Sequence, residues 1–496
     1  MRNGRWIGLS ALLLILSFPP FDLGGLAWGA LVPWLIALKG ASGRQALRRS
    51  AAMGLLFFAG TIWWISYVTV PGLILLVAIL ALYFAAWGLL ARRLLASPAP
   101  GSATLLGLPA AWAILEYARS ILLSGFGWNL LAHTQWNWIR LIQIADLTGV
   151  YGISFLVVMV NVALYQVIVG RGSGVVRRWV PLGVALACLA AASLYGFLRL
   201  PGIGSLPQGE FRVAVTQGNI PQPEKWDLEF QETIWRRYEA LTIEAAQRKP
   251  DLIVWPETAV PDYLDDLRVI SRLKSIARRA GAALLVGAPF SAGERLFNGA
   301  ALVEPEGPLR QRYDKIHRVP FGEYVPMGPL LGWLRRFVLM GNFSPGGRFT
   351  VFRPSDGAVA PFSVLVCFED LFPGLCRRFA HEGARWHIVI TNDAWFGRSA
   401  ASLQHLQCSV FRAVENRIWI ARAANNGWSG FISPAGVRTE SIPRFVPGLA
   451  VGSLPIEEGG SLYTRWGDWF LLLCALLLGS AFLPQTKGYN KRFTPS

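Results

Sequence analysis

The sequence predicts an α-helical membrane domain joined to an α/β domain, and two observations support that division. Hydrophobic residues make up 53% of the 496 positions, more than a soluble protein of this size usually carries. They are also unevenly distributed, because residues 1–200 and 468–484 form long apolar runs whereas 205–460 has a mixed composition. We therefore expect a transmembrane domain with seven spans at 1–200, a second domain at 201–466, and an eighth span with a cytoplasmic tail at 467–496.

A helix needs about 20 mainly apolar residues to cross the hydrocarbon core of a bilayer. By this criterion we expect spans near residues 6–20, 22–38, 51–69, 72–91, 103–121, 148–169, 179–199 and 467–484. The first resembles a signal peptide, because Arg2 and Arg5 precede its apolar core. It lacks a small-residue cleavage site and other spans follow it, so we interpret it as a span.

The charge distribution predicts the side of the membrane on which each loop lies. The net charge is +17, from 47 basic and 30 acidic residues. The basic residues gather in alternate loops and after the last span: Lys39, Arg44, Arg48, Arg49, Arg92, Arg93, Arg171, Arg177, Arg178, Lys487, Lys491 and Arg492. Such clusters are typical of cytoplasmic loops, so both termini are expected in the cytoplasm and residues 200–466 outside it. This pattern indicates a lipid bilayer as partner and no nucleic acid.

The second domain alternates short apolar segments with segments of helical periodicity. Strands are expected at 212–219, 251–258, 283–289, 362–369, 387–393 and 419–427, and helices at 228–248, 263–280, 370–382 and 400–417. Short, fully apolar strands between helices indicate a sheet covered by helices. In such folds, functional side chains tend to follow the ends of strands.

Three chemically useful side chains lie at strand ends or on a loop. Glu257 leaves the strand in "VWPET", Lys315 and Glu323 lie in "YDKIHRVPFGEYVP", and Cys367 ends "VLVC". A thiol attacks as thiolate, with a free pKa near 8.5, so Glu257 would take its proton as general base. Lys315 would stabilise an oxyanion, with the backbone N–H of Phe368 as a second donor.

Each of these residues also has a structural interpretation. Cys367 could be a small buried hydrophobic residue, Lys315 a surface lysine beside Asp314, and Glu257 a solvated loop charge. The sequence contains no CxxC or HExxH motif and its five histidines are scattered, so no metal and no cofactor is expected. A disulfide between Cys376 and Cys408 is left open.

Three strings resemble the signature regions of a known family. "WPETAVP", "YDKIHRVPFGEYVP" and "VLVCFEDLFP" resemble those of the nitrilase superfamily, whose members use a Glu–Lys–Cys triad in an α-β-β-α sandwich. "PFGEYVP", together with spans before and after the domain, is similar to one membrane-embedded branch, the apolipoprotein N-acyltransferases. The resemblance extends over essentially the whole chain, including "QGNIPQPEKW" and "TNDAWFG".

The resemblance implies roles for individual residues. Glu257 corresponds to the general base, Lys315 to the oxyanion stabiliser and Cys367 to the nucleophile, with Glu323 as a second glutamate that assists them. Glu369 and Trp226 match positions important for activity or substrate handling, and Phe368 stands where some members have tyrosine, which puts a hydroxyl-dependent role there in doubt.

The implied reaction is a two-step acyl transfer. Cys367 would take an acyl chain from a membrane phospholipid as a thioester. The N-terminal amine of a diacylglyceryl-cysteine lipoprotein would then receive it. The expected setting is the bacterial inner membrane, with the catalytic domain of a monomer on the periplasmic face.

Two aromatic segments are further candidates for lipid contact. The segment 327–343 carries Trp333, Phe337 and Met340 and is expected either to bind substrate as a lid in the interface or to pack as an ordinary amphipathic helix. The tryptophans of 124–141, which are Trp128, Trp136 and Trp138, are expected to anchor the protein at the membrane surface. Glu116 and Arg119, one turn apart in the fifth span, are expected to satisfy each other or to lie near the interface.

Two other functions remain as alternatives. A membrane-tethered amidase of the nitrilase type would use the same triad with water as the acceptor. A transporter or scaffold with an inert outer domain would show broken helices and matched repeats within its spans, and neither is evident.

Overall fold

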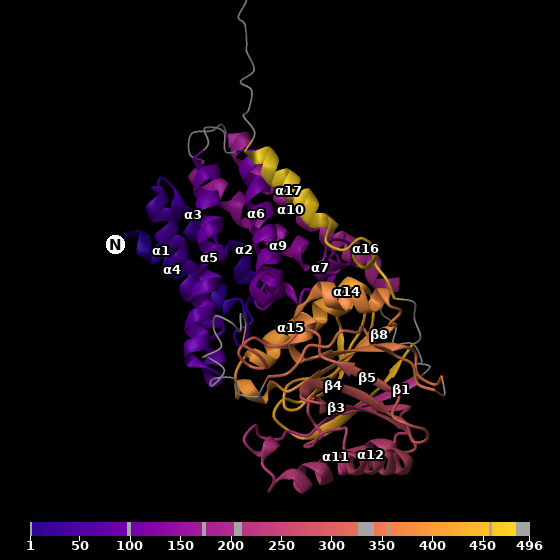
Figure 1. Ribbon diagram of the computed structural model, residues 1–496. Coiled ribbons are helices and arrows are strands. Elements are labelled where there is room, and N and C mark those ends of the chain that lie inside the picture. The colour runs from indigo at the N-terminus through magenta and orange to yellow at the C-terminus, as the bar shows by residue number, and fades with distance from the viewer. Residues whose placement is uncertain are drawn as a thin grey trace, which may run out of the picture.

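The computed structural model describes residues 2–96, 101–170, 175–202, 211–325, 342–355, 357–455 and 459–482. Within these ranges a bundle of apolar helices lies at one end of the molecule and an α/β sandwich at the other (Figure 1). The last described helix returns from the sandwich to the bundle, where it packs on α6. The sandwich is therefore joined to the bundle at both of its ends.

The bundle is built from helices of very different length. Its elements are α1 (Arg2–Leu16), α2 (Ala27–Ala30), α3 (Val32–Leu38), α4 (Gly43–Thr61), α5 (Val70–Leu95), α6 (Ser102–Ile121), α7 (Ile139–Ile142), α8 (Ala145–Thr148), α9 (Val150–Val169), α10 (Val175–Arg199) and α17 (Trp469–Ala481). Side-chain caps begin two of the long ones. Ser42 forms a capping box with Gln45 before α4, and Thr69 caps α5.

The expectation of eight spans is not met in the described part of the chain. Four helices there are long and apolar enough to cross a membrane: Val70–Leu95, Ala103–Ser124, Val150–Val169 and Arg178–Arg199. Shorter apolar helices occupy Gly4–Leu16, Gly24–Leu38 and Trp469–Ala481. The expected span at 22–38 is divided into a 3₁₀ turn and two short helices. The one expected at 51–69 belongs to α4, which begins eight residues earlier in a basic segment and ends at Thr61.

The sandwich contains two mixed six-stranded sheets. Their strands are β1 (Phe211–Gln217), β2 (Leu252–Val254), β3 (Ala283–Ala292), β4 (Arg295–Val303), β5 (Gln311–Asp314), β6 (Val351–Phe352), β7 (Phe362–Val366), β8 (Trp386–Thr391), β9 (Ile420–Ala424), β10 (Ser429–Ile432), β11 (Arg438–Ile442) and β12 (Gly448–Leu454). The orders are β12-β1-β2-β3-β4-β5 and β11-β10-β9-β8-β7-β6. In each sheet the three parallel strands (β1-β2-β3 and β7-β8-β9) are flanked by antiparallel ones.

Helices cover the outer faces of both sheets, which gives the expected α-β-β-α order. On one side lie α11 (Gln231–Ala246) and α12 (Leu267–Ala280), and on the other α14 (Pro373–His381) and α15 (Ala401–Asn416). All six expected strands and four expected helices of this domain are present. The expectation of an α/β layered domain is confirmed.

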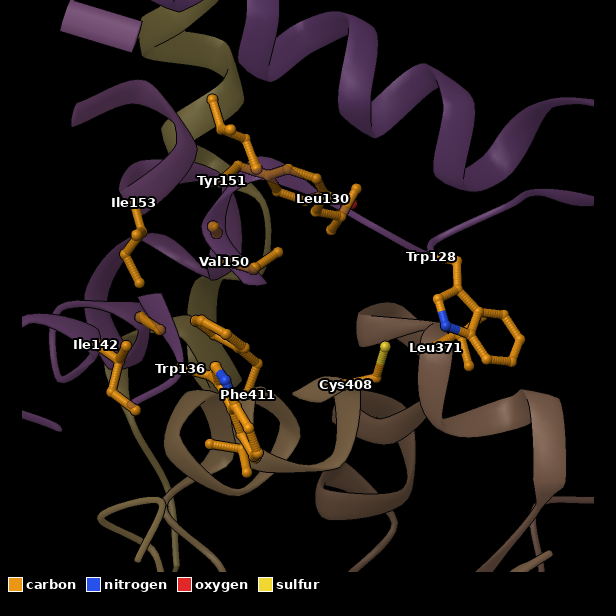
Figure 2. Close-up of a cluster of buried hydrophobic side chains, with 14 of the residues drawn as sticks. Trp128, Leu130, Trp136, Ile142, Val150, Tyr151, Ile153, Leu371, Cys408 and Phe411 are labelled. Atoms are coloured by element: carbon orange, nitrogen blue, oxygen red, sulfur yellow. The ribbon is translucent and has the colours of Figure 1, made fainter. Parts of the chain in front are cut away.

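The second helix pair lies between the sandwich and the bundle. Almost the whole of α15 is buried, because one of its sides faces the sheet and the other faces the bundle (Figure 1). Figure 2 shows side chains of the bundle, Trp128, Leu130 and Tyr151 among them, on the opposite side of this contact from Leu371, Cys408 and Phe411 of the sandwich. Buried apolar side chains of the two parts thus belong to one hydrophobic cluster, and their burial stabilises the contact.

The tryptophans of the 124–141 loop are placed differently from one another. Trp128 and Trp136 are buried, at 3% and 5% exposure, whereas Trp138 is 45% exposed. For Trp128 and Trp136, the expectation of membrane anchoring is wrong, because their rings fill the contact between bundle and sandwich. Glu116 and Arg119 do not pair directly but hold this loop: Arg119 donates to the carbonyl of Trp128 at 2.7 Å, and Glu116 accepts the N–H of Leu131 at 2.7 Å.

Candidate active site

The sandwich brings together the side chains that the sequence places at strand ends. Cys367 directly follows β7, and Glu257 lies three residues after β2, so the two come from different sheets. Lys315 follows β5 at the edge of the first sheet. Cys367 has a φ of 55°, a left-handed conformation that is unusual outside glycine. The chain therefore turns sharply at the thiol.

A close packing of backbone segments positions Glu257. At Gly287 of β3, a Cβ would lie 2.3 Å from the carbonyl oxygen of Pro256 and 2.7 Å from the Cα of Glu257. Only glycine fits here. The Glu257 side chain then reaches the space between the sheets, where Oε1 accepts from Asn298 at 2.8 Å and Oε2 accepts from the N–H of Asn392 at 2.9 Å.

Two carboxylates share the ammonium of Lys315. Its Nζ lies 3.0 Å from Oε1 of Glu323 and 3.7 Å from Oε1 of Glu257, and all three side chains are almost completely buried. Burial lowers the pKa of Lys315, but the carboxylates of Glu323 and Glu257 outweigh this effect and raise it above its ordinary value. Lys315 is therefore a fixed positive charge.

Asn298 completes this cluster. Its Nδ2 donates to Glu257 and to Glu323, at 2.8 Å in each case, and its carbonyl oxygen accepts the backbone N–H of Lys315 at 2.8 Å. Asn298 thus fixes the positions of Glu257, Glu323 and Lys315 relative to one another.

The Cys367 side chain is a neutral thiol in this arrangement. Burial and the neighbouring Glu257 carboxylate raise its pKa well above the ordinary value, and Lys315 opposes them. Attack by this sulfur therefore requires a base that removes the proton as the bond forms. The Glu257 carboxylate is the neighbouring charged group that acts most strongly on this thiol.

Glu369 connects the two segments that carry Lys315 and Cys367. Its Oε1 accepts from the hydroxyl of Tyr313 at 2.7 Å and from the N–H groups of Ile316 and His317 at 2.8 and 3.0 Å, and its Oε2 accepts from the N–H of Val366 at 2.8 Å. Burial raises the pKa of Glu369 to about 7, against these hydrogen bonds. The Glu369 side chain thus holds the backbone of both segments in place.

The other expected site residues have different surroundings. Phe368 is buried, with its ring 5.1 Å from Phe372 and 6.3 Å from Trp128. Trp226 is 45% exposed and lies in a short 3₁₀ turn, next to Lys225. Trp333, Phe337, Met340 and the segment proposed as a lid lie outside the described residues, apart from 342–343.

A buried charged cluster beneath Cys367 was not expected from the sequence. His405 on α15 lies 2.7 Å from Asp370 and 2.9 Å from Asp393, and its Nε2 is 3.2 Å from the carbonyl oxygen of Cys367. Arg422 lies 3.2 and 3.4 Å from the same two aspartates. Burial lowers the pKa of His405, yet the aspartates raise it to about 9 overall. His405 is thus an imidazolium that holds the turn at the thiol.

Three further residues of the site were also missed. Asn298 lies on a hairpin strand, Asn392 in "TNDAWFG", and Lys225 next to Trp226 in "QGNIPQPEKW". The last two strings were noted as part of the family resemblance, which is the one signal that points to them. Among the described residues no cluster of side chains suited to a metal ion is found, and all four described cysteines of the sandwich and last helix, including Cys376 and Cys408, are free thiols.

Comparison with known proteins matches both parts of the chain. The model of the apolipoprotein N-acyltransferase N-terminal domain matches residues 10–163, and that of carbon-nitrogen hydrolase matches 212–463. An apolipoprotein N-acyltransferase of Geobacter metallireducens is 42% identical over 94% of this chain and 92% of that protein. The chain belongs to the apolipoprotein N-acyltransferase family. Relatives of the same name from Azotobacter vinelandii and Chlorobaculum tepidum are 34% and 30% identical, over 97% and 95% of this chain and 95% and 94% of theirs.

Solved structures also match about half of this chain. The crystal structure of an amidase from Nesterenkonia sp. has 21% sequence identity to this chain and a TM-score of 0.39. The match covers 55% of this chain and 97% of the amidase.

Proposed function

We propose that this protein transfers an acyl chain from a membrane phospholipid to the N-terminal amine of a diacylglyceryl-cysteine lipoprotein. The observation that carries the proposal is the buried group of Glu257, Lys315, Glu323 and Cys367, in a chain that matches apolipoprotein N-acyltransferases over both of its parts. Within this group, Cys367 is the nucleophile, Glu257 the base and Lys315 the charge that faces the developing oxyanion.

The first step acylates the enzyme. Glu257 takes the proton of the Cys367 thiol while the sulfur attacks the ester carbonyl of the phospholipid, and the C–S bond forms. The carbonyl electrons move onto oxygen, where Lys315 stabilises the charge. When the C–O bond breaks, Glu257 returns the proton to the leaving alkoxide. The products are the Cys367 thioester and a lysophospholipid.

The second step transfers the acyl chain to nitrogen. The free α-amine attacks the thioester carbonyl, the C–N bond forms, and the C–S bond breaks. Glu257 carries one proton from the nitrogen to the departing sulfur, so the thiol and the base return to their first states. The role of Glu323 is to hold Lys315 with Asn298, and that of Glu369 is to fix the two segments relative to each other.

Contacts with the bundle favour a lipid substrate over a small amide. His317 lies two residues after Lys315, and its Nε2 is 2.7 Å from the carbonyl oxygen of Ser124, in the 3₁₀ turn (Leu122–Ser124) that follows α6. The Ser124 hydroxyl is 2.7 Å from the hydroxyl of Tyr324, next to Glu323. The loop that supplies the lysine thus rests on a helix long and apolar enough to span a membrane, and a substrate drawn from the bilayer suits this position.

The distribution of charge supports an extracytoplasmic position for the sandwich. The turn before α5 packs on the sandwich, where Trp64 contacts Phe396 with ring centroids 4.6 Å apart. Arg92 and Arg93 lie in the last turn of this helix, about 33–35 Å from its first residue at 1.5 Å per residue. Basic residues at the end remote from the sandwich follow the positive-inside rule. We assign the membrane domain to 1–200, the catalytic domain to 201–466 and the C-terminal segment to 467–496 of an inner-membrane protein.

The test is a comparison of acceptors. Purified protein in detergent micelles would be given phospholipid and a fluorescent diacylglyceryl-cysteine peptide, and separately small aliphatic amides, with Cys367→Ala as the inactive variant and Cys188→Ala as the matched control. We expect a triacylated peptide from wild type and C188A and no ammonia from the amides. Release of ammonia without peptide acylation would overturn acyl transfer in favour of the tethered amidase.

A further inference from the structure

A second lysine lies inside the site and has no role in the steps above. Lys225 belongs to a short 3₁₀ turn (Glu224–Trp226) and is 2% exposed, whereas its neighbour Trp226 is 45% exposed. A lysine is almost never buried to this extent unless it is paired with an acid. The burial of Lys225 without an acidic partner among the described residues is therefore unusual, and a chemical function would explain it.

The amine of Lys225 makes one hydrogen bond. Nζ donates to the main-chain carbonyl oxygen of Glu257 at 2.9 Å. Among the described residues no carboxylate forms an ion pair with it and no other group donates to it, so the lone pair of the neutral amine is available. Glu257 is thus held from two sides, by Lys315 at its carboxylate and by Lys225 at its backbone.

The groups that act on this amine are those of the reaction itself. They are the Glu257 carboxylate, from the segment after β2, and the Cys367 thiol, at the end of β7; its own turn also carries Glu224. Burial lowers the pKa of Lys225 to about 7, although Glu257 and Cys367 oppose this. The side chain is therefore partly unprotonated at neutral pH, which Lys315 is not.

The second step has a proton that Glu257 does not account for. An α-amine has a pKa of about 7.7–8.0 in water, so at neutral pH most of the acceptor is an ammonium without a lone pair. That ammonium must lose one proton before it attacks and a second one afterwards. Glu257 handles the second, which ends on sulfur, and the first needs another base.

We propose that Lys225 accepts this first proton from the acceptor's ammonium, an inference that rests on the proposed acyl transfer to an α-amine. One N–H bond of the ammonium breaks and its electron pair stays on that nitrogen, while a new N–H bond forms at Nζ of Lys225. The free amine then attacks the thioester as described. Lys225 releases its proton to water before the next acceptor arrives, on the side where Trp226 is exposed.

The experiment measures the two steps separately in the full-length protein. Enzyme loaded with phospholipid acyl chain and freed of excess lipid would receive the diacylglyceryl peptide, and thioester decay would be followed by intact mass between pH 6.5 and 9.5. The variants are Lys225→Met and Lys225→Arg, with Lys274→Met, at a half-buried lysine of α12 on the outer face of the sandwich, as the matched control. Thioester formation by the same preparations reports the first step and correct folding.

For K225M we expect transfer about 10-fold slower than wild type at pH 7 and within about 2-fold at pH 9.5, where the acceptor is already a free amine. Thioester formation loses only the bond from Lys225 to the Glu257 backbone, so it should fall by less than transfer does at pH 7, and K274M should match wild type. K225R should not restore the loss at pH 7, because arginine stays protonated. Rescue by K225R, or a loss that is equal at all pH values, would overturn the proposal and leave only a structural bond to Glu257.

If K225M forms no thioester, K225R decides: normal transfer at pH 7 contradicts the inference, and a pH-dependent loss supports it. If wild type itself forms a thioester but never acylates the peptide, the proposed function fails, and the inference fails with it.

Discussion

The indole ring of Trp128 lies 5.3 Å from the imidazole of His405. Trp128 belongs to a loop of the helical bundle, and His405 holds the carbonyl of Cys367 through its Nε2, 3.2 Å away. The bundle therefore reaches the turn that carries the thiol through a single intervening side chain. This contact gives the membrane domain a part in positioning the site, in addition to keeping it near lipid.

Replacing Trp128 should disturb both stability and turnover. Its ring also lies 4.9 Å from Trp64 and 6.0 Å from Phe396, so Trp128→Ala leaves a cavity between bundle and sandwich. We expect the free energy of unfolding to fall by about 3–5 kcal/mol, with a lower apparent Tm in detergent. We also expect kcat to fall by more than KM changes. Trp138→Ala, at an exposed ring of the same loop, is the control. An unchanged Tm for W128A would show that the packing of Trp128 between bundle and sandwich does not stabilise the protein.

The charge of His405 should make stability depend on pH. The folded protein raises the pKa of His405 from 6.5 to about 9, so between these values only the folded state binds the proton. The stabilisation is complete below pH 6.5 and is lost as the pH rises through 9, by about 3 kcal/mol for a shift of this size. Chemical denaturation from pH 6 to 10 should show this slope in wild type and a flatter one in His405→Gln. Parallel slopes would contradict a protonated His405.

Loss of the Asn298 amide should affect catalysis more than binding. In Asn298→Ala both acids lose a donor, and they are free to shift relative to Lys315. We expect kcat to fall about 10- to 100-fold, as is common when reacting groups move by about 1 Å, with KM for phospholipid nearly unchanged. Asn137→Ala, at an exposed amide, serves as the comparison. A KM effect alone would mean that Asn298 contacts substrate.

Glu369 should be required for the structure around Lys315. Glu369→Ala leaves four donors without their acceptor in a buried region, and each buried donor left unpaired costs about 1–3 kcal/mol of stability. We expect a lower apparent Tm and slower alkylation of Cys367 by iodoacetamide at fixed pH. Glu382→Ala, at the exposed residue that directly follows α14, should change neither quantity. Normal stability together with complete loss of transfer would instead assign Glu369 a direct chemical role.

The sequence pointed to Glu257, Lys315 and Cys367 because each lies at a recognisable strand end or in a distinctive loop. Cys367 comes directly after a run of buried β-branched and aliphatic residues, Glu257 three residues after another, and Lys315 lies in a loop rich in glycine and proline. Asn298 escaped notice because its strand contains Asn-Gly, a dipeptide typical of hairpin turns. In the structure, Asn298 and Gly299 both lie inside β4, and the chain makes no turn at this dipeptide.

The remaining misses have a common physical origin, which is contact between the two domains. His405 lies on a helix with no solvated face, so helical periodicity gave no sign of a charged cluster within it. Trp128 and Trp136 have the composition of a membrane interface but pack against protein, and residue type alone does not distinguish the two. Hydropathy likewise counted 22–38 as a span, although Gly24, Gly25 and Pro33 occur where the structure has short helical pieces.

The central claim is that Cys367 carries the acyl chain. Its most direct test is the intact mass of wild type, Cys367→Ala and Cys188→Ala after incubation with a phospholipid of defined chains. Wild type and C188A should each gain the mass of one acyl group, hydroxylamine should remove it, and C367A should gain none. An adduct that persists in C367A, or phospholipid turnover by wild type without any adduct, would contradict the account.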